Sequence, residues 1–154
     1  MVTNLHDIES AVAERLQSVG HTVTATEVEE GFDKPTFFID IFQNSVKKEN
    51  SFMELVNVGV ELKYIHNKPT REVLVNTADA LTVLFTQTAL KVKDRFLSVY
   101  EITFDTENNV LFAYFELEFM RETLKINPDY EKMHNLNFNF EMEVRTNGTA
   151  PNID

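Results

Sequence analysis

Acidic side chains are the groups most densely placed for chemistry in this sequence. Glu27, Glu29, Glu30 and Asp33 lie close together along the chain. Carboxylates at such spacing can bind a divalent cation, and a pair of them can hydrolyse a glycosidic bond. Cation sites draw on a more fixed geometry than adjacent carboxylates of one turn supply. We therefore interpret the cluster as a solvated turn, and a metal or hydrolase site is the alternative.

The other signatures of catalysis are missing from the sequence. The histidines occur on separate segments without the spacing of a helical metal pair: His6, His21, His66 and His134. With only four glycines and no G-x-S-x-G motif, the chain offers neither a nucleophile elbow nor a phosphate-binding loop. The stretch DTENN at 105–109 lacks the glycine and the last glutamate of a calcium loop, and it predicts a hairpin turn. We expect no enzyme activity, no metal and no cofactor.

Composition indicates a single soluble domain. The chain has 154 residues, of which 43% are hydrophobic, and this is enough for one sizeable core. The net charge of -11 opposes binding to nucleic acid phosphates, and residues 101–154 hold 4 basic against 11 acidic side chains. The absence of cysteine fits a reducing cytoplasm. No apolar run reaches the roughly 20 residues of a membrane span, so we expect no membrane contact.

Two segments have the apolar spacing of helices. The first has a candidate N-cap at Thr3 or Asn4 and a candidate terminator at Gly20. The second follows the start signals Asn67, Pro69 and Thr70. The apolar positions are Leu5, Ile8, Val12, Leu16 and Val19 in the first helix, and Leu74, Ala78, Leu81 and Phe85 in the second.

Strands are predicted between and after these helices. A short one is expected in 21–28, another begins near Thr36 after a turn, and a polar stretch from Gln43 separates it from a third within 52–65. In the turn, Gly31 can take a positive φ, and Pro35 suits the first position of a strand. Two strands around 105–109 are expected to form the longest hairpin of the sheet. Alternation over 136–144 predicts a last strand.

The fold class that follows is α+β. Helices confined to two places among hairpin-linked strands predict a largely antiparallel sheet with both helices packed on one face. The expected order is αβββαβββ in a single domain over residues 1–145. A flexible C-terminal tail is expected over 146–154.

Two strands carry more apolar surface than one face of a sheet can bury. Phe37, Ile39 and Ile41 alternate toward a core, but Phe38 and Phe42 point the other way. The last predicted strand has a five-residue apolar stripe. These residues either lie under the chain's own layers or contact another molecule, and the candidate interface residues are Phe38, Phe42, Leu136, Phe138, Phe140, Met142 and Val144.

The order of these segments resembles the tail terminator proteins of tailed bacteriophages. The likeness covers roughly residues 5–145 and includes EVEEGFDKPTFFIDI, VGVELKYIHN and NNVLFAYFELEF. Its most specific part is E-G-F-x-x-P-x-F-F-I, from Glu30 to Ile39.

The resemblance implies a structural protein of the virion that is assembled in the host cytoplasm. Such proteins form rings, commonly hexamers, at the head-proximal end of the tail tube, where they stop polymerisation and form the surface to which the head docks. The implied partners are copies of the chain itself, the tail tube protein and the head-tail connector protein. DNA would pass through the lumen without specific binding.

Two other functions remain open at this point. The first is a different head-tail joining ring or a tail-tube component with similar layers. The second is a small cytoplasmic enzyme or ligand-binding domain with an acidic pocket over residues 27–33. Position in an assembled particle separates the first from a terminator. Stabilisation by a metal or ligand would favour the second.

Overall fold

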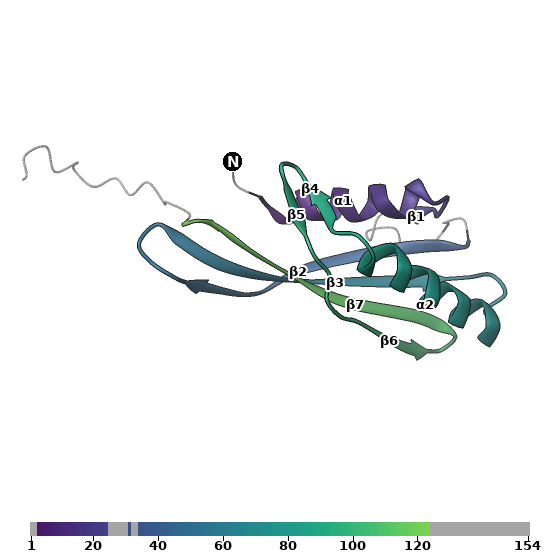
Figure 1. Cartoon of the computed structure of the whole chain (residues 1–154). Coiled ribbons are helices and arrows are strands. Elements are labelled where there is room, and N and C mark those ends of the chain that lie inside the picture. The colour runs from purple at the N-terminus through teal and green to yellow at the C-terminus, as the bar shows by residue number, and fades with distance from the viewer. Residues whose placement is uncertain (1–2, 25–30, 32–33, 124–154) are drawn as a thin grey trace, which may run out of the picture. The chain divides into compact units, whose positions relative to one another are not determined.

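Two helices cover one face of a five-stranded sheet in the computed structural model of the protein, which describes residues 3–24, 31 and 34–123 (Figure 1). Helix α1 (Leu5–Ser18) packs mainly on strand β2 (Thr36–Lys48). Helix α2 (Arg71–Thr86) packs on β7 (Val110–Glu122) and β6 (Ile102–Glu107). The predicted α+β class, the order of its elements and the placement of both helices on one face are confirmed.

Both helices begin at the predicted polar residues. The side chain of Asn4 accepts a hydrogen bond from the backbone of Asp7, whose carboxylate accepts one from the backbone of Asn4, and this closes a capping box. Thr70 caps α2 through the backbone N–H of Val73. Each helix then turns its apolar stripe toward the sheet, and α2 also buries Thr77.

The sheet has the strand order β1-β2-β3-β7-β6. Strand β1 (Val23–Thr24) runs parallel to β2, whereas β2, β3 (Met53–Ile65), β7 and β6 pair in antiparallel fashion. Gly31 has the predicted positive φ of 81°, and Pro35 directly precedes β2. Asn108 and Asn109 both have positive φ, as a tight hairpin turn between β6 and β7 requires.

The polar stretch that was expected to separate two strands is itself a strand. Strand β2 continues to Lys48 and pairs with β3 across a bulge between Gln43 and Ser45. No apolar alternation marks these residues because all of 43–48 are exposed. The hairpin β2–β3, with 13 residues in each strand, is therefore the longest, and the prediction for β6–β7 was wrong because β6 has only 6 residues.

A small hairpin of β4 (Leu90–Val92) and β5 (Arg95–Leu97), which was not predicted from the sequence, follows α2. Lys93 at its tip forms an ion pair with Asp7 of α1, with 3.0 Å between the charged atoms. The guanidinium of Arg95 donates to the carbonyl oxygen of Met120 and lies over the ring of Phe119. The hairpin thus connects the helix layer to the end of β7.

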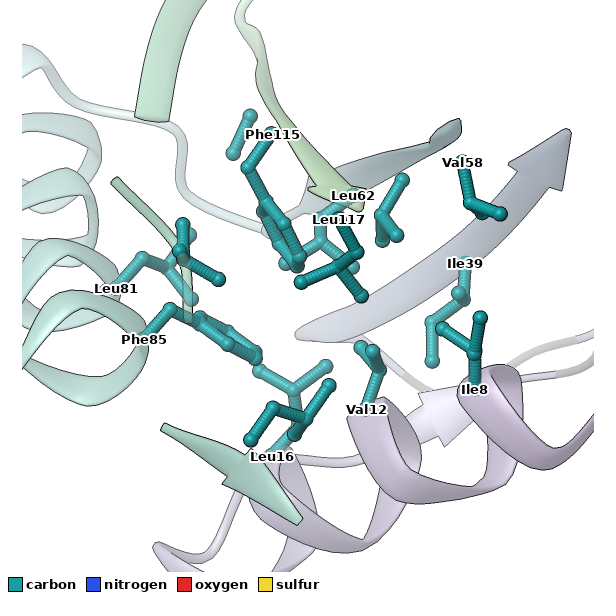
Figure 2. Packing of buried hydrophobic residues seen from close by; sticks show 14 of the residues in the cluster. Ile8, Val12, Leu16, Ile39, Val58, Leu62, Leu81, Phe85, Phe115 and Leu117 are labelled. Atoms are coloured by element: carbon teal, nitrogen blue, oxygen red, sulfur yellow. The ribbon is translucent and has the colours of Figure 1, made fainter. Parts of the chain in front are cut away.

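One hydrophobic core joins the two helices, the β4–β5 hairpin and the covered face of the sheet. Figure 2 shows side chains of both helices and of the sheet pointing into the same cluster, with Phe85 of α2 near Phe115 of β7. Fully buried side chains of this size contribute about 1.5 to 3 kcal/mol each. Among the described residues, no helix is long and apolar enough to span a membrane.

Two sequence predictions cannot be compared with the structure. The last predicted strand, which contains Leu136, Phe138, Phe140, Met142 and Val144, lies outside the described residues. So does the tail over 146–154.

Arg15 of α1 binds the end of α2, whose own last turn carries no basic residue. Its guanidinium donates to the carbonyl oxygens of Leu84, Thr88 and Ala89, at 3.3, 2.9 and 2.8 Å. The last carbonyls of a helix have no partner within the helix and attract a cation. Partial burial lowers the pKa of Arg15, but an arginine remains charged.

Replacing Arg15 with methionine should lower the free energy of unfolding by about 1 to 3 kcal/mol, because charge-assisted hydrogen bonds to three carbonyls are lost. Arg15→Lys should recover part of this loss. The matched control is Arg71→Met at the exposed start of α2, where a cation has no favourable helix end. Denaturant unfolding measures all three variants. An equal loss in the Arg15→Met and Arg71→Met variants would contradict the role of Arg15.

Candidate functional site

The face of the sheet opposite the helices is the candidate functional surface, and we call it the open face. It carries alternate residues of β2, β3 and β7, whose neighbours in sequence point into the core. Its central residues are Phe38, Asp40 and Phe42 of β2, Gly59, Glu61 and Lys63 of β3, and Phe112, Tyr114, Glu116 and Glu118 of β7.

The two phenylalanines predicted at an interface lie on this face in different environments. Phe38 is half-buried, whereas Phe42 remains 39% exposed. The ring of Phe42 stacks on that of Tyr114 across the middle strand, with 6.0 Å between centroids and 18° between planes. The chain therefore covers part of the apolar surface that the sequence left unexplained.

Gly59 makes this stacking feasible. It lies opposite Phe42 in the register, and a Cβ atom built on it would lie 2.6 Å from Cε2 and 2.8 Å from Cζ of Phe42. Such distances are shorter than van der Waals contact. A glycine inside a strand often marks a close approach of this kind, and this signal was present in the sequence but not used.

A polar network adjoins the stacked rings. Asn44 donates to Asn57 at 2.8 Å and to the hydroxyl of Tyr114 at 2.9 Å. Tyr114 and Asn57 in turn donate to Glu116, at 3.0 and 3.2 Å. Burial raises the pKa of Tyr114; the hydrogen bond from Asn44 lowers it, and the hydrogen bond to Glu116 and the charge of Glu116 raise it again. The net shift is upward, so the hydroxyl stays protonated and can donate.

A hollow of about 610 Å³ lies next to this network, between the end of β7 and the segment that joins β5 to β6. We call it the edge hollow. Phe96 and Tyr100, which are 67% and 93% exposed, belong to its lining. Its carboxylates are those of Glu101, Glu116 and Glu118. Aromatic rings and acids without a basic side chain suit a partner that presents apolar and cationic groups.

The residues that could perform chemistry do not assemble into a site within the described part of the chain. His6 is exposed on α1, His21 packs edge-on against Phe37, and His66 accepts a hydrogen bond from the backbone of Lys68. No group of three or more His, Asp or Glu side chains among the described residues could hold a metal ion. The acidic cluster of Glu27, Glu29, Glu30 and Asp33 lies outside the described residues, as does His134.

Phe38 and Phe42 could be named from the sequence, but their surroundings could not. Tyr114, Asn44, Asn57 and Glu116 are individually ordinary strand residues. Only the register of β2, β3 and β7 places them side by side. Because strand pairing is a long-range property, the sequence of any one strand could not reveal this network.

Gly59→Ala should destabilise the protein by about 1 kcal/mol, because the added methyl group displaces the ring of Phe42. In a Phe42→Ala background, the same change should cost clearly less, because the remaining close atom is the hydroxyl oxygen of Tyr114, at 3.0 Å from the added Cβ, and alanine costs less backbone entropy than glycine. A double-mutant cycle of unfolding free energies measures the difference. Equal effects of Gly59→Ala in both backgrounds would show that the ring does not depend on the glycine.

Comparison with known proteins identifies the family. A family model described as phage tail terminator protein matches residues 7–131. This match contains the sheet and α2, together with most of α1. No curated protein matches the chain. The family is one of structural proteins rather than enzymes. The chain therefore belongs to the phage tail terminator protein family and is a structural protein of the phage tail.

Proposed function

We propose that this protein forms a ring, with six subunits as the expected number, at the head-proximal end of the phage tail tube. There it ends the polymerisation of the tube protein and presents the surface to which the head-tail connector docks. The family match over residues 7–131 carries this proposal. The features of the sheet described above support it.

The open face supports contact between subunits. Phe42 remains partly exposed after stacking on Tyr114, and Phe96 and Tyr100 expose most of their surface nearby. Phe38 and Phe42 would lie against a neighbouring copy, and the two surfaces that meet would differ, as in any ring built head to tail. Burying a large apolar side chain at a well-packed contact contributes about 1.5 to 3 kcal/mol.

The C-terminal stripe is the second proposed contact. Leu136, Phe138, Phe140, Met142 and Val144 alternate with polar residues. A strand with such a stripe can pair with an open edge of another copy, where backbone hydrogen bonds supply affinity and side chains supply specificity. The same segment would then hold adjacent subunits together.

The acidic balance suits a channel for DNA. The net charge is -11. Like charge discourages phosphates from adhering to a surface. DNA leaving the head would then pass through the lumen of the ring without specific binding.

Replacing Phe138 and Phe140 together with serine should abolish ring formation and leave a folded monomer, because the apolar contact to the neighbour is lost. The matched control is Asn137→Ser with Asn139→Ser, on the polar side of the same segment. A sizing column measures the assembly, and circular dichroism measures folding. An unchanged size of the Phe138→Ser, Phe140→Ser variant would count against the C-terminal contact.

Phage tails assembled without this protein should be longer than normal and without heads, because nothing stops the tube or accepts the connector. Electron microscopy of lysates from phage that lack the gene gives the length distribution. Supplying the wild-type protein in trans should restore uniform length. Tails of normal length in its absence would exclude termination, and missing tubes would instead indicate a component of the tube.

A further inference from the structure

The hairpin β2–β3 extends past the helices as an exposed arm, which we define as residues 43–53. Within the described residues, no strand pairs with residues 44–48 of β2 on the side away from β3. Val46 and Phe52 are 40% and 71% exposed. Lys47 and Lys48 are the only adjacent basic pair in the sequence, and with Glu49 they leave the arm a small net positive charge on an acidic protein. Lys47 forms an ion pair with Glu49 of the same arm at 3.0 Å, but an exposed pair of this kind is weak, so Lys47 can exchange it for another carboxylate.

A second open edge lies on the other side of the sheet. Strand β6 pairs with β7 only as far as Phe115, and within the described residues no strand continues along 116–122 on that side. The carbonyl oxygen of Met120 in this stretch is occupied by the guanidinium of Arg95, so pairing along the whole stretch requires Arg95 to move. This stretch, the β7 edge, carries Glu116, Glu118 and Glu122 on the open face. The exposed rings of Phe96 and Tyr100 stand beside it in the edge hollow.

The arm and the β7 edge lie at the same position along the direction of the strands. Lys47 and Met120 both lie opposite Leu55, one from each side of β3. Lys47 also lies on the same face as Glu118 and Glu122, because it corresponds to Met120 in the register and these two residues are two positions away from Met120 along β7. Since β3 separates the edges, one copy cannot pair them with each other. Rotation about a ring axis does not change the height of a residue along that axis. The arm of one copy can therefore pair with the β7 edge of the next copy.

We propose that the arm of one subunit docks along the β7 edge of the next, with Lys47 between Glu118 and Glu122 and with the arm covering Phe96 and Tyr100. This inference rests on the proposed ring and names the surfaces that close it. Backbone pairing and the aromatic residues supply affinity. The charges select the partner, because exposed ion pairs add little affinity but like charges oppose wrong pairings.

The lysines also oppose pairing between two free edges. Lysine on an edge strand is a common means of blocking unwanted strand pairing. Two arms meeting each other would bring four lysines together, whereas an arm meeting the β7 edge brings lysines to carboxylates. The same side chains therefore disfavour arm-to-arm contact and favour the ring contact.

Charge reversal tests the pairing in the full chain. The arm variant is Lys47→Glu with Lys48→Glu, and the edge variant is Glu118→Lys with Glu122→Lys. Each variant alone should need about tenfold or more protein to reach half assembly, because every contact then joins like charges. Light scattering over a concentration series, with and without purified tail tubes, gives this midpoint. Thermal unfolding verifies that each variant folds.

Combining the arm changes with the edge changes gives the decisive test. The chain with all four changes should assemble like the wild type, and an equal mixture of the arm and edge variants should form rings in which they alternate. The control is Lys68→Glu with Lys91→Glu, two exposed lysines off the arm with the same change in charge, which should leave assembly unchanged.

The remaining outcomes separate the two proposals. If the wild type forms no ring, either alone or on tubes, the proposed function itself fails. If the wild type forms rings and either reversed variant forms them equally well, only the arm-to-edge contact is overturned. This result is expected if the chain's own C-terminal segment occupies the β7 edge. Loss of assembly without rescue in the recombined variants overturns the contact as well.

Discussion

The length of the strands relative to the helices governs this fold. A strand of 13 residues extends about 43 Å, whereas helices of 14 and 16 residues extend about 21 and 24 Å. The two helices lie on one face, so they cannot cover the opposite face. They also leave the end of the β2–β3 hairpin bare (Figure 1). The arm follows from this mismatch, and the open face follows from the placement of both helices on one side of the sheet.

The open face combines a stacked aromatic ring with polar groups that are hydrogen-bonded to one another. Phe42 lies flat over Gly59 and Tyr114 rather than projecting into solvent. Asn44, Asn57 and Glu116 satisfy one another and the hydroxyl of Tyr114 through hydrogen bonds. A surface of this composition resembles protein interfaces, which mix aromatic residues with a polar rim. It can be soluble in a monomer and still gain from contact with a partner.

The elements with strong local signals were predictable from the sequence. Both helices have polar caps and apolar stripes, and Val56 to Tyr64 alternates clearly, so these segments lie where they were predicted. The arm and the β4–β5 hairpin were missed because exposed residues such as Lys47 carry no alternation and three-residue strands give no period. At the candidate site, Phe42 could be found from its strand alone. The residues that contact Phe42 could not be found in this way, because only the register of β2, β3 and β7 brings them next to it.

The contact of Arg15 with the end of α2 has a consequence for how the protein forms during synthesis. The guanidinium and its three carbonyl acceptors are separated by 69 to 74 residues along the chain. While the ribosome is still producing β3, α1 lacks its contact with α2, and the core residues of β7 are not yet present. Ile8, Val12 and Leu16 therefore cannot be fully buried. The two helices therefore complete their packing only after most of the sheet has emerged. A nascent chain stalled before α2 would expose these apolar residues and be a substrate for chaperones.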